Sequence, residues 1–373
     1  MRIVVTNHPP GLAVQRGDGT LRPIHPLWLR ERCNDPAARD ALTGQRLYDP
    51  SDLDPQTAVV GVLELGAGSW QVSFADGMCG AFGAAEILAE MPGAPSPLPA
   101  RRPWTAALAQ PSRIAWSADP SDHQLLRIAE AFLSQGFVIF SGVSQEPGTV
   151  LSVARTFGLP RDTNFGLLFD VRTQPSATDL AYTGLALDAH TDNPYRDPVP
   201  GIQLLHCLVN ESTGGYSTLV DGYAVVEHLH ETDRAAWDIL TSTPVTFVYR
   251  DAGTELIHSA PMIELDSDGT FAGIRFSPRL DFVPLLDLHD LTAFYAARRT
   301  LDRLLRSVTF EIRFLLRPGD LVMFDNRRLL HGRTGFDPQQ GIRHLQGCYI
   351  DMDGVHSRYR VLHRSVTASE LAA

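Results

Sequence analysis

Lysine is absent from the 373-residue sequence, in which all 32 basic residues are arginine. A Schiff-base enzyme needs a lysine amine, and the Walker A loop and the protein kinases each need a lysine that contacts phosphate. The sequence therefore excludes these three chemistries in their usual form. A GC-rich genome, which favours arginine codons, is the simplest explanation of this bias.

Basic charge, long apolar runs and cysteine are also scarce. The net charge of −11 argues against a nucleic-acid partner, which requires a basic face. No apolar run approaches the ~20 residues of a membrane span, and the N-terminus lacks the apolar core of a signal peptide. Four separated cysteines without a CxxC motif are typical of free thiols in a reducing compartment. We therefore expect a cytoplasmic protein that acts on a small molecule, without nucleic-acid or membrane partners.

Two short strand-like runs, 59–65 and 70–74, are separated by Gly and Ser residues and predict a hairpin. The proline-rich stretch 91–103 follows and predicts an exposed linker. We therefore expect a small N-terminal β-rich domain over 1–95, a linker over 96–112 and a larger domain over 113–373.

The larger domain begins with a predicted helix over 122–135, a buried strand over 137–140 and a short helix over 149–157. One helical insert is expected over 286–306. The remaining pattern is mostly of strands, over 202–209, 217–220, 245–249, 308–314, 321–324 and 345–350. Many short strands with few helices predict a mainly β fold, either a sandwich or a jelly roll.

His190-Thr191-Asp192 is the only H-x-D triplet in the chain. On an extended segment, positions i and i+2 point to one face, so this imidazole and carboxylate could bind one metal ion. A non-haem Fe(II) site needs one more histidine, and His331, which follows an apolar strand, is the best candidate. The other histidines are interpreted as strand, surface or cap residues, with His206 and His344 inside strands.

Arg343 lies beyond His331 at the start of another predicted strand. A buried guanidinium needs an anion and can hold a carboxylate with two hydrogen bonds. A surface arginine on an edge strand is the alternative interpretation.

Together these segments resemble the Fe(II)- and 2-oxoglutarate-dependent dioxygenases of the taurine dioxygenase superfamily, and within it the γ-butyrobetaine and trimethyllysine hydroxylase group. The segments that carry the resemblance are 181–192 (AYTGLALDAHTD), 201–207 (GIQLLHC), 214–222 (GGYSTLVDG), 325–333 (DNRRLLHGR) and 343–349 (RHLQGCY). The resemblance covers nearly the whole chain and implies a double-stranded β-helix, a form of jelly roll, with flanking helices.

By position, the resemblance implies that His190, Asp192 and His331 bind the iron. It implies that Arg343 holds the distal carboxylate of 2-oxoglutarate, with help from Thr218. The implied reaction uses O2 and converts 2-oxoglutarate to succinate and CO2 while an aliphatic C–H bond is hydroxylated. The iron supplies this chemistry, and the protein supplies positioning and a dry pocket. Relatives in the group are commonly dimers, which leaves a homodimer open.

The sequence departs from the family in its N-terminal domain, where relatives often bind structural zinc with three cysteines and a histidine. Only Cys33 remains here, with Asp35, Ala38 and Met78 at the other three positions. One thiol cannot form a closed tetrahedral site, so we predict no structural zinc.

The substrate pocket is also altered relative to the betaine hydroxylase, whose aromatic side chains surround a trimethylammonium group. The matching positions here are Phe165, Phe169, Tyr182 and Asn193, so one ring is lost, and Tyr195 is a candidate replacement. Plain core packing is the alternative role for these rings.

Arg275 and Arg279 lie in the stretch that meets the acid end of the substrate in relatives, and two arginines suit a carboxylate or a phosphonate. The expected substrate is a small zwitterion with an ammonium and an acid group, such as γ-butyrobetaine or a (trimethylamino)ethylphosphonate. Oxygenation of another small acid, such as a sulfonate, and a non-catalytic jelly-roll binding module are the alternatives.

Overall fold

The computed structural model describes residues 1–372 except 95, 109–110 and 173–183. The chain divides into two compact units, Met1–Ser96 and Pro97–Ala373. Each unit has its own hydrophobic core.

The N-terminal unit consists of two three-stranded antiparallel sheets and two short helices. The predicted hairpin is present, with β4 and β5 paired along their length. Trp70, Val72 and Phe74 alternate along β5 and bury their side chains in the core. The elements of this unit are β1 (Arg2–Asn7), β2 (Pro10–Gln15), β3 (Leu21–Pro23), α1 (Pro26–Glu31), β4 (Val59–Gly66), β5 (Ser69–Phe74), β6 (Cys79–Gly83) and α2 (Ala84–Ala89).

Hydrogen bonds join the segment after α1 to strand β6, in the region where relatives carry zinc ligands. The Cys33 thiol donates to the Cys79 carbonyl, and the Asn34 side-chain oxygen accepts from Ala81 N–H. The Asp35 carboxylate accepts from Cys79 N–H. Of these three residues, Cys33 is the retained cysteine and Asp35 stands at another of the expected ligand positions, and all four cysteines of the chain are free.

The predicted linker 96–112 is only partly an exposed connection. The backbone N–H of Trp104 donates to Asp221, its indole N–H donates to the Gln135 carbonyl, and the side chain is buried. Arg102 N–H donates to the Ser134 carbonyl. The segment 102–104 therefore packs as part of the larger unit, because its aromatic side chain and backbone groups find partners there.

The larger unit is built on a seven-stranded sheet and a four-stranded sheet. The seven-stranded sheet has the order β10-β22-β12-β20-β8-β7, with β9 paired to β22, and the four-stranded sheet has the order β11-β21-β13-β19. Side chains of both sheets share one buried cluster, so the sheets pack face to face. Their strands are β7 (Arg113–Ala115), β8 (Phe137–Ser141), β9 (Pro160–Arg161), β10 (Phe169–Arg172), β11 (Leu187–His190), β12 (Ile202–Asn210), β13 (Ser217–Asp221), β19 (Glu311–Phe314), β20 (Leu321–Asp325), β21 (Leu329–Arg333) and β22 (Arg343–Ile350).

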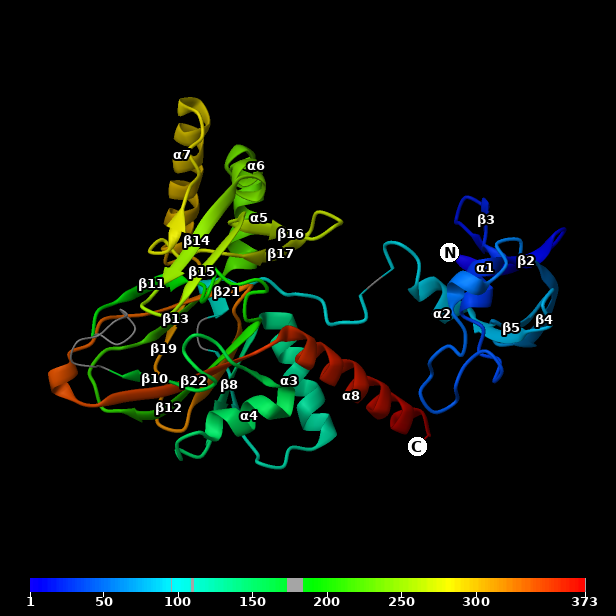
Figure 1. Cartoon of the computed structure of the whole chain (residues 1–373). Helices are drawn as coiled ribbons and strands as arrows, with labels where there is room; N and C mark the ends of the chain where they lie inside the picture. Colours follow the sequence, from blue (N-terminus) through cyan, green and yellow to red (C-terminus); the bar gives the residue numbers. More distant parts are fainter. Residues whose placement is uncertain (95, 109–110, 173–183, 373) are drawn as a thin grey trace. The chain divides into compact units, whose positions relative to one another are not determined.

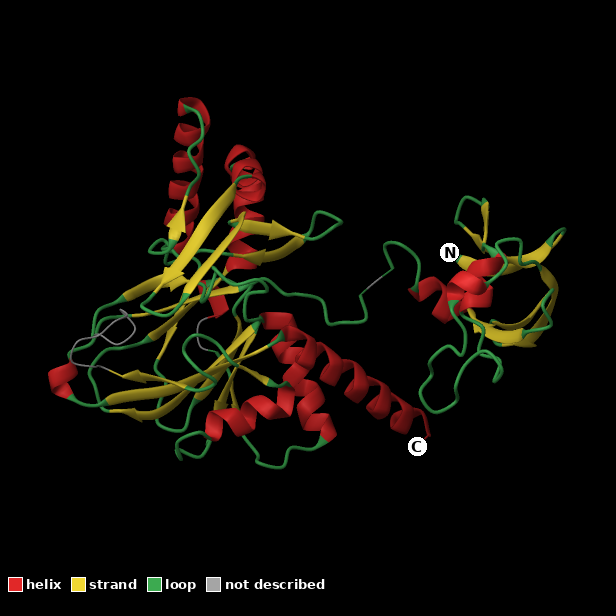
Figure 2. Cartoon of the chain, viewed as in Figure 1, coloured by secondary structure: helices red, strands yellow, loops and turns green. Residues whose placement is uncertain are grey.

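Helices cover the outer surfaces of these sheets (Figures 1 and 2). α3 (Asp122–Gln135), α4 (Thr149–Phe157) and α8 (Met352–Ala372) share a core with β8, β12, β20 and β22. The predicted start and end of α3 are confirmed, since Ser121 caps its N-terminus and Gly136 ends it at a φ of 84°.

A second group of helices packs with two small sheets around another core. It contains α5 (Gly222–Thr232), α6 (Arg234–Ser242) and α7 (Leu288–Leu305), with β14 (Pro244–Arg250), β15 (Glu255–Pro261), β16 (Ile263–Leu265), β17 (Phe271–Ile274) and β18 (Asp281–Phe282). The sequence predicted α7 as the only helical insert, and this was wrong, because α5 and α6 also interrupt the strands. The described residues contain no helix long and apolar enough to cross a membrane.

Candidate active site

Two neighbouring strands of the four-stranded sheet bring His190 and His331 together. β11 and β21 pair antiparallel, with His190 directly opposite His331, and the ring centroids are 4.4 Å apart. Asp192 lies two residues beyond His190, just after β11 ends. The predicted triplet and the distant third residue therefore form one cluster, in which the ligand atoms all lie within 4.8 Å of one another.

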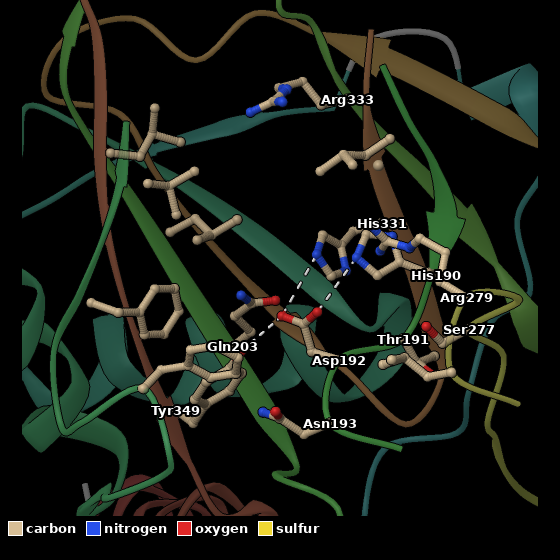
Figure 3. Close-up of a pocket in the computed structure, with 18 of the residues that line it drawn as sticks. His190, Thr191, Asp192, Asn193, Gln203, Ser277, Arg279, His331, Arg333 and Tyr349 are labelled. Atoms are coloured by element: carbon tan, nitrogen blue, oxygen red, sulfur yellow. Dashed lines mark hydrogen bonds and ion pairs between the residues drawn. The ribbon is translucent and has the colours of Figure 1, made fainter. Parts of the chain in front are cut away.

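The donor set of this cluster fits a single divalent metal ion. His190 Nε2 lies 3.4 Å from Asp192 Oδ1, and His331 Nε2 lies 3.8 Å from Asp192 Oδ2 (Figure 3). Ligand atoms that bind one ion at about 2 Å are separated from one another by roughly 3–3.5 Å, so only small adjustments are needed. Two imidazoles and one carboxylate are the donor set of a non-haem iron centre with open positions.

Burial and neighbouring charges set the ionisation of the cluster. Burial alone raises the pKa of Asp192, but His331, His190 and the Tyr349 hydroxyl outweigh it and hold the pKa well below its usual range. Burial lowers the pKa of His331 to about 4. A carboxylate at Asp192 beside a neutral imidazole at His331 is an ionisation state that suits binding of a metal cation.

Neighbouring groups fix the orientation of the His190 and Asp192 side chains. His190 Nδ1 lies 2.8 Å from the Asp188 carbonyl, which can only accept, so Nδ1 carries the proton and Nε2 faces the cluster. The Tyr349 hydroxyl donates to Asp192 Oδ2 at 2.8 Å.

Asn326 holds the Asp192 backbone in place. Its side-chain oxygen accepts from Asp192 N–H at 2.8 Å, and its Nδ2 donates to the Asp192 carbonyl at 3.0 Å. The same Nδ2 donates to the Pro200 carbonyl. Asn326 is fully buried, and both its side-chain oxygen and its Nδ2 have hydrogen-bond partners inside the protein.

The cluster lies in a cavity of about 320 Å³ between the two packed sheets. This volume is at the lower end for small-molecule sites. The lining residues are Phe165, Phe169, Val171, Leu187, His190, Thr191, Asp192, Asn193, Tyr195, Gln203, Leu205, Ser217, Tyr249, Arg250, Ser277, Arg279, Leu280, His331, Gly332, Arg333, Arg343, Leu345 and Tyr349.

Two arginines lie in one part of this cavity. Arg343 is buried, and its Nε has no hydrogen-bond partner among the described residues. Burial lowers its pKa to about 10, and burial together with repulsion from Arg343 has the same effect on Arg333. Both guanidinium groups lie against the Phe336 ring. A buried cation without an anion among the described residues is suited to bind a carboxylate of a ligand.

The strand register does not place Thr218 in this cavity. Thr218 pairs with Gly332, whereas Ser217 pairs with Arg333 and Leu219 with His331. Because side chains alternate along a strand, Thr218 lies on the face opposite to His331. Ser217 lines the cavity instead. Ser217, rather than Thr218, is therefore the hydroxyl side chain that the structure places in the cavity.

Of the residues predicted to bind the substrate, Phe165, Phe169, Asn193, Tyr195 and Arg279 line the cavity. Tyr182 lies outside the described residues.

Arg275 does not line the cavity, so its predicted substrate contact is wrong. Its guanidinium pairs with Glu264 and donates to the Pro194 and Arg196 carbonyls, both at 2.8 Å. The chain leaves strand β17 at Ile274, so strand alternation does not extend to Arg275 and Arg279.

Several cavity residues were not predicted from the sequence. Tyr349 lies in a segment that carried the family resemblance, yet nothing local indicated its hydrogen bond to Asp192. Tyr249, Arg250 and Gln203 come from strands whose inward face depends on the tertiary structure. The Gln203 side-chain oxygen is buried and has no partner among the described residues.

One other cluster of possible metal ligands occurs in the described part of the chain, formed by Asp287, His289 and Asp290. All three residues are exposed. Asp287 accepts a hydrogen bond from Asp290 N–H and caps α7, so this cluster is explained by the helix N-terminus.

The fold matches that of oxygenases with known structures. Asparagine oxygenase, solved in complex with Fe(II), hydroxyasparagine and succinate, superposes with a TM-score of 0.50 and 18% sequence identity, over 61% of this chain and 78% of that chain. This similarity shows a shared fold, and the strands and helices of the described residues confirm the mainly β prediction.

The family described as "Taurine catabolism dioxygenase TauD, TfdA family" matches residues 100–349. The γ-butyrobetaine dioxygenase of Pseudomonas sp. strain AK-1 is 36% identical over 363 residues, which cover 95% of this chain and 94% of that protein. The human γ-butyrobetaine dioxygenase is 37% identical over 238 residues, 62% of this chain and 61% of that protein. The chain belongs to the TauD/TfdA dioxygenase family, which confirms the predicted resemblance, and it is an enzyme rather than a non-catalytic binding module.

Proposed function

We propose that the protein is an Fe(II)- and 2-oxoglutarate-dependent hydroxylase of a small zwitterion that carries a trimethylammonium group and an acid group. One observation carries this proposal. A single cavity contains the His190–Asp192–His331 cluster, a buried arginine without an anion among the described residues, and several aromatic rings. The similarity to γ-butyrobetaine dioxygenase over nearly the whole chain supports the substrate class. The two packed sheets are consistent with a double-stranded β-helix.

In this proposal His190, Asp192 and His331 hold Fe(II), and Arg343 binds the distal carboxylate of 2-oxoglutarate. When bound, iron, 2-oxoglutarate and O2 supply the oxidation that replaces a C–H hydrogen by a hydroxyl group and releases succinate and CO2. The protein orients the substrate and excludes water. Val171, Leu205 and Leu345 line the same cavity as Arg343, and an apolar lining strengthens the attraction between a guanidinium and a carboxylate.

The two charged ends of the substrate have different partners in the cavity. Phe165 and Phe169 offer ring faces, which attract a quaternary ammonium. Arg279, which also lines the cavity, offers a guanidinium for the acid group. Figure 3 shows Tyr349 on one side of Asp192 and Ser277 and Arg279 on the other. A zwitterion that spans these two sides would place its central C–H bonds beside the metal.

The structure changes the argument about the acid group. Two arginines, Arg275 and Arg279, favoured a phosphonate as well as a carboxylate. Arg275 is occupied by Glu264 and two backbone carbonyls, so only Arg279 of this pair can reach the substrate. One guanidinium matches the single charge of a carboxylate better than the higher charge of a phosphonate. We therefore propose a carboxylate.

The test is succinate release by the iron-loaded enzyme with γ-butyrobetaine, 2-(trimethylammonio)ethylphosphonate and taurine, with mass spectrometry of the organic product. We expect γ-butyrobetaine to stimulate succinate release and to gain one oxygen atom. Stimulation by taurine alone would contradict the trimethylammonium assignment. Stimulation by the phosphonate in preference to the carboxylate would contradict only the acid-group assignment. The His190→Ala variant is the control, since it should release no succinate with any compound.

A further inference from the structure

We propose that Tyr249 is a substrate-binding residue that completes a closed aromatic ring around the ammonium group and determines the preference for a quaternary ammonium over a neutral group of the same shape. This inference rests on the proposed function and extends it to a residue on another sheet. Neither the sequence motifs nor the comparisons with relatives assign a role to Tyr249.

Five aromatic side chains of the cavity contact one another in sequence. The Tyr195 and Tyr249 ring centroids are 5.1 Å apart, and those of Tyr249 and Phe165 are 5.9 Å apart. The series continues from Phe165 to Phe169 at 6.4 Å and from Phe169 to Tyr349 at 5.3 Å. All five residues line the same cavity. Tyr249 connects the Tyr195 end of this series to the Phe165 end.

Hydrogen bonds tie both ends of the aromatic series to the metal-binding segment. The Tyr349 hydroxyl donates to Asp192 Oδ2 at 2.8 Å, and the Tyr195 hydroxyl donates to Asn193 Oδ1 at 2.6 Å. Asp192 and Asn193 are adjacent in the chain, so the series closes on itself beside the metal ligand. A cation held by these rings would therefore have a fixed position relative to the metal.

The position of Tyr249 is fixed by its strand. Val245 and Phe247 on β14 are buried in the core beneath α5, α6 and α7, and Tyr249 follows them on the same face. β14 is paired on both sides, with β15 and β18. The Tyr249 hydroxyl donates to Asp251 at 2.8 Å, which restrains the far end of the ring. The strand pairing of β14 therefore fixes one end of the Tyr249 side chain, and the hydrogen bond to Asp251 restrains the other end.

Tyr249, rather than Tyr195, supplies the ring surface that Asn193 lacks. Tyr195 is only 3% exposed and packs against Tyr249, with the ring centroids 5.1 Å apart. Tyr249 is half-buried and presents its ring to the cavity. Aromatic rings attract a quaternary ammonium through their negative faces, and this attraction is absent for an uncharged tert-butyl group.

The test measures binding to the Fe(II)- and 2-oxoglutarate-loaded protein without O2, by isothermal titration calorimetry. The probes are γ-butyrobetaine and 5,5-dimethylhexanoate, in which carbon replaces the charged nitrogen. We expect Tyr249→Leu to weaken γ-butyrobetaine binding about five- to thirtyfold and dimethylhexanoate binding less than about twofold. Tyr249→Phe, which keeps the ring and loses the hydroxyl, should leave both affinities within about twofold of the wild type.

Two further variants distinguish a wrong role for Tyr249 from a wrong proposed function. Tyr295→Leu, which changes an exposed tyrosine on α7, should alter neither affinity. If Phe169→Leu weakens γ-butyrobetaine binding selectively but Tyr249→Leu does not, the role of Tyr249 is overturned and the proposed function stands. Equal weakening of both probes by Tyr249→Leu would also overturn it, because the ring would then act only by packing. If the wild type binds no γ-butyrobetaine, both the proposed substrate class and the proposed role of the aromatic residues are contradicted.

Discussion

The hydroxyl of Tyr349 donates a hydrogen bond of 2.8 Å to Oδ2 of Asp192, so one metal-facing carboxylate oxygen is already oriented before any ligand binds. Groups that orient a metal ligand in this way commonly account for ten- to hundredfold in metal affinity. Tyr349→Phe retains the ring and removes only this bond. We expect it to weaken Fe(II) binding about tenfold while the Michaelis constant for the substrate changes little, as measured by metal titration and steady-state kinetics. Unchanged Fe(II) affinity would show that the backbone contacts of Asp192 alone position its carboxylate.

Asn326 is expected to position the same carboxylate through the Asp192 backbone. Asn326→Asp removes both Nδ2 donor bonds and places an acidic group beside two carbonyl oxygens. We expect a loss of unfolding free energy of about 2–3 kcal/mol and a parallel loss of Fe(II) affinity. Asn210→Asp is the matched control, because it removes a donor bond to the Leu316 carbonyl, and Asn210, which pairs with Arg343 across β12 and β22, makes no hydrogen bond to His190, Asp192 or His331. It should lower stability without changing Fe(II) affinity, and an equal loss of affinity in both variants would contradict a positioning role for Asn326.

Substitution of Arg275 should lower the stability of the protein, whereas substitution of Arg279 should weaken substrate binding. Arg275→Met removes a buried ion pair and two bonds to backbone carbonyls, and we expect it to lower the unfolding free energy by about 3 kcal/mol. Arg279→Met should leave stability within about 0.5 kcal/mol and raise the Michaelis constant for the zwitterion about ten- to hundredfold. Urea denaturation and kinetics on both variants check this pair. A raised Michaelis constant in Arg275→Met and a loss of stability in Arg279→Met would instead indicate that Arg275 binds the substrate.

Arg343 should stabilise the complex with 2-oxoglutarate but lower the unfolding free energy of the protein without ligand. A buried guanidinium without an anion lowers stability, so Arg343→Met should raise the unfolding free energy of the ligand-free protein by about 1–3 kcal/mol. The same variant should lose most of the thermal stabilisation that 2-oxoglutarate gives the wild type. Thermal unfolding with and without 2-oxoglutarate measures both effects. If 2-oxoglutarate stabilises the variant as much as the wild type, Arg343 does not bind its carboxylate.

His206 should make the protein sensitive to mild acid. It is fully buried in β12, its ring nitrogens have no partner among the described residues, and burial lowers its pKa to about 4. In the unfolded chain the pKa is about 6.5, so between these values the unfolded state binds a proton that the folded state does not. Stability contributed by the neutral imidazole is therefore complete above pH 6.5 and is lost as the pH falls towards 4.

The measurement is urea denaturation of the metal-free protein at pH 7 and pH 5. We expect this change in pH to cost the wild type about 1–2 kcal/mol more than it costs His206→Leu. His289→Gln, which changes a side chain that is 92% exposed, should behave as the wild type does. Equal acid sensitivity in the wild type and His206→Leu would assign the effect to other groups.

The clustering of His190, Asp192 and His331 could be predicted because their sequence motifs are specific. His190 and Asp192 are close in sequence, and His331 lies in a motif with a recognisable apolar strand before it. The α3 boundaries were equally readable, because Ser121 and Gly136 act within one turn of the helix. These are local properties, and local properties are what a single sequence shows most directly.

The errors came from the direction of individual side chains. Thr218 and Ser217 differ only in strand parity, which the pairing with β21 decides. Arg275 and Arg279 are four residues apart on irregular backbone, where no periodicity predicts which of them turns towards Glu264. Tyr249 and Asn326 act through partners far away in the chain. His206 was interpreted as a satisfied strand histidine, and its buried ring instead lacks a partner among the described residues.

The pairing of His190 with His331 has a consequence for the order of events during synthesis of the protein. The two histidines are far apart in the sequence and become neighbours only when β11 and β21 pair. Contacts between distant parts of a chain form late, since the intervening segment must first be closed into a loop. A nascent chain that has not yet paired β11 with β21 therefore lacks the complete His190–Asp192–His331 cluster. Metal binding would then require this pairing, and it would be delayed in any variant that slows the pairing of the two strands.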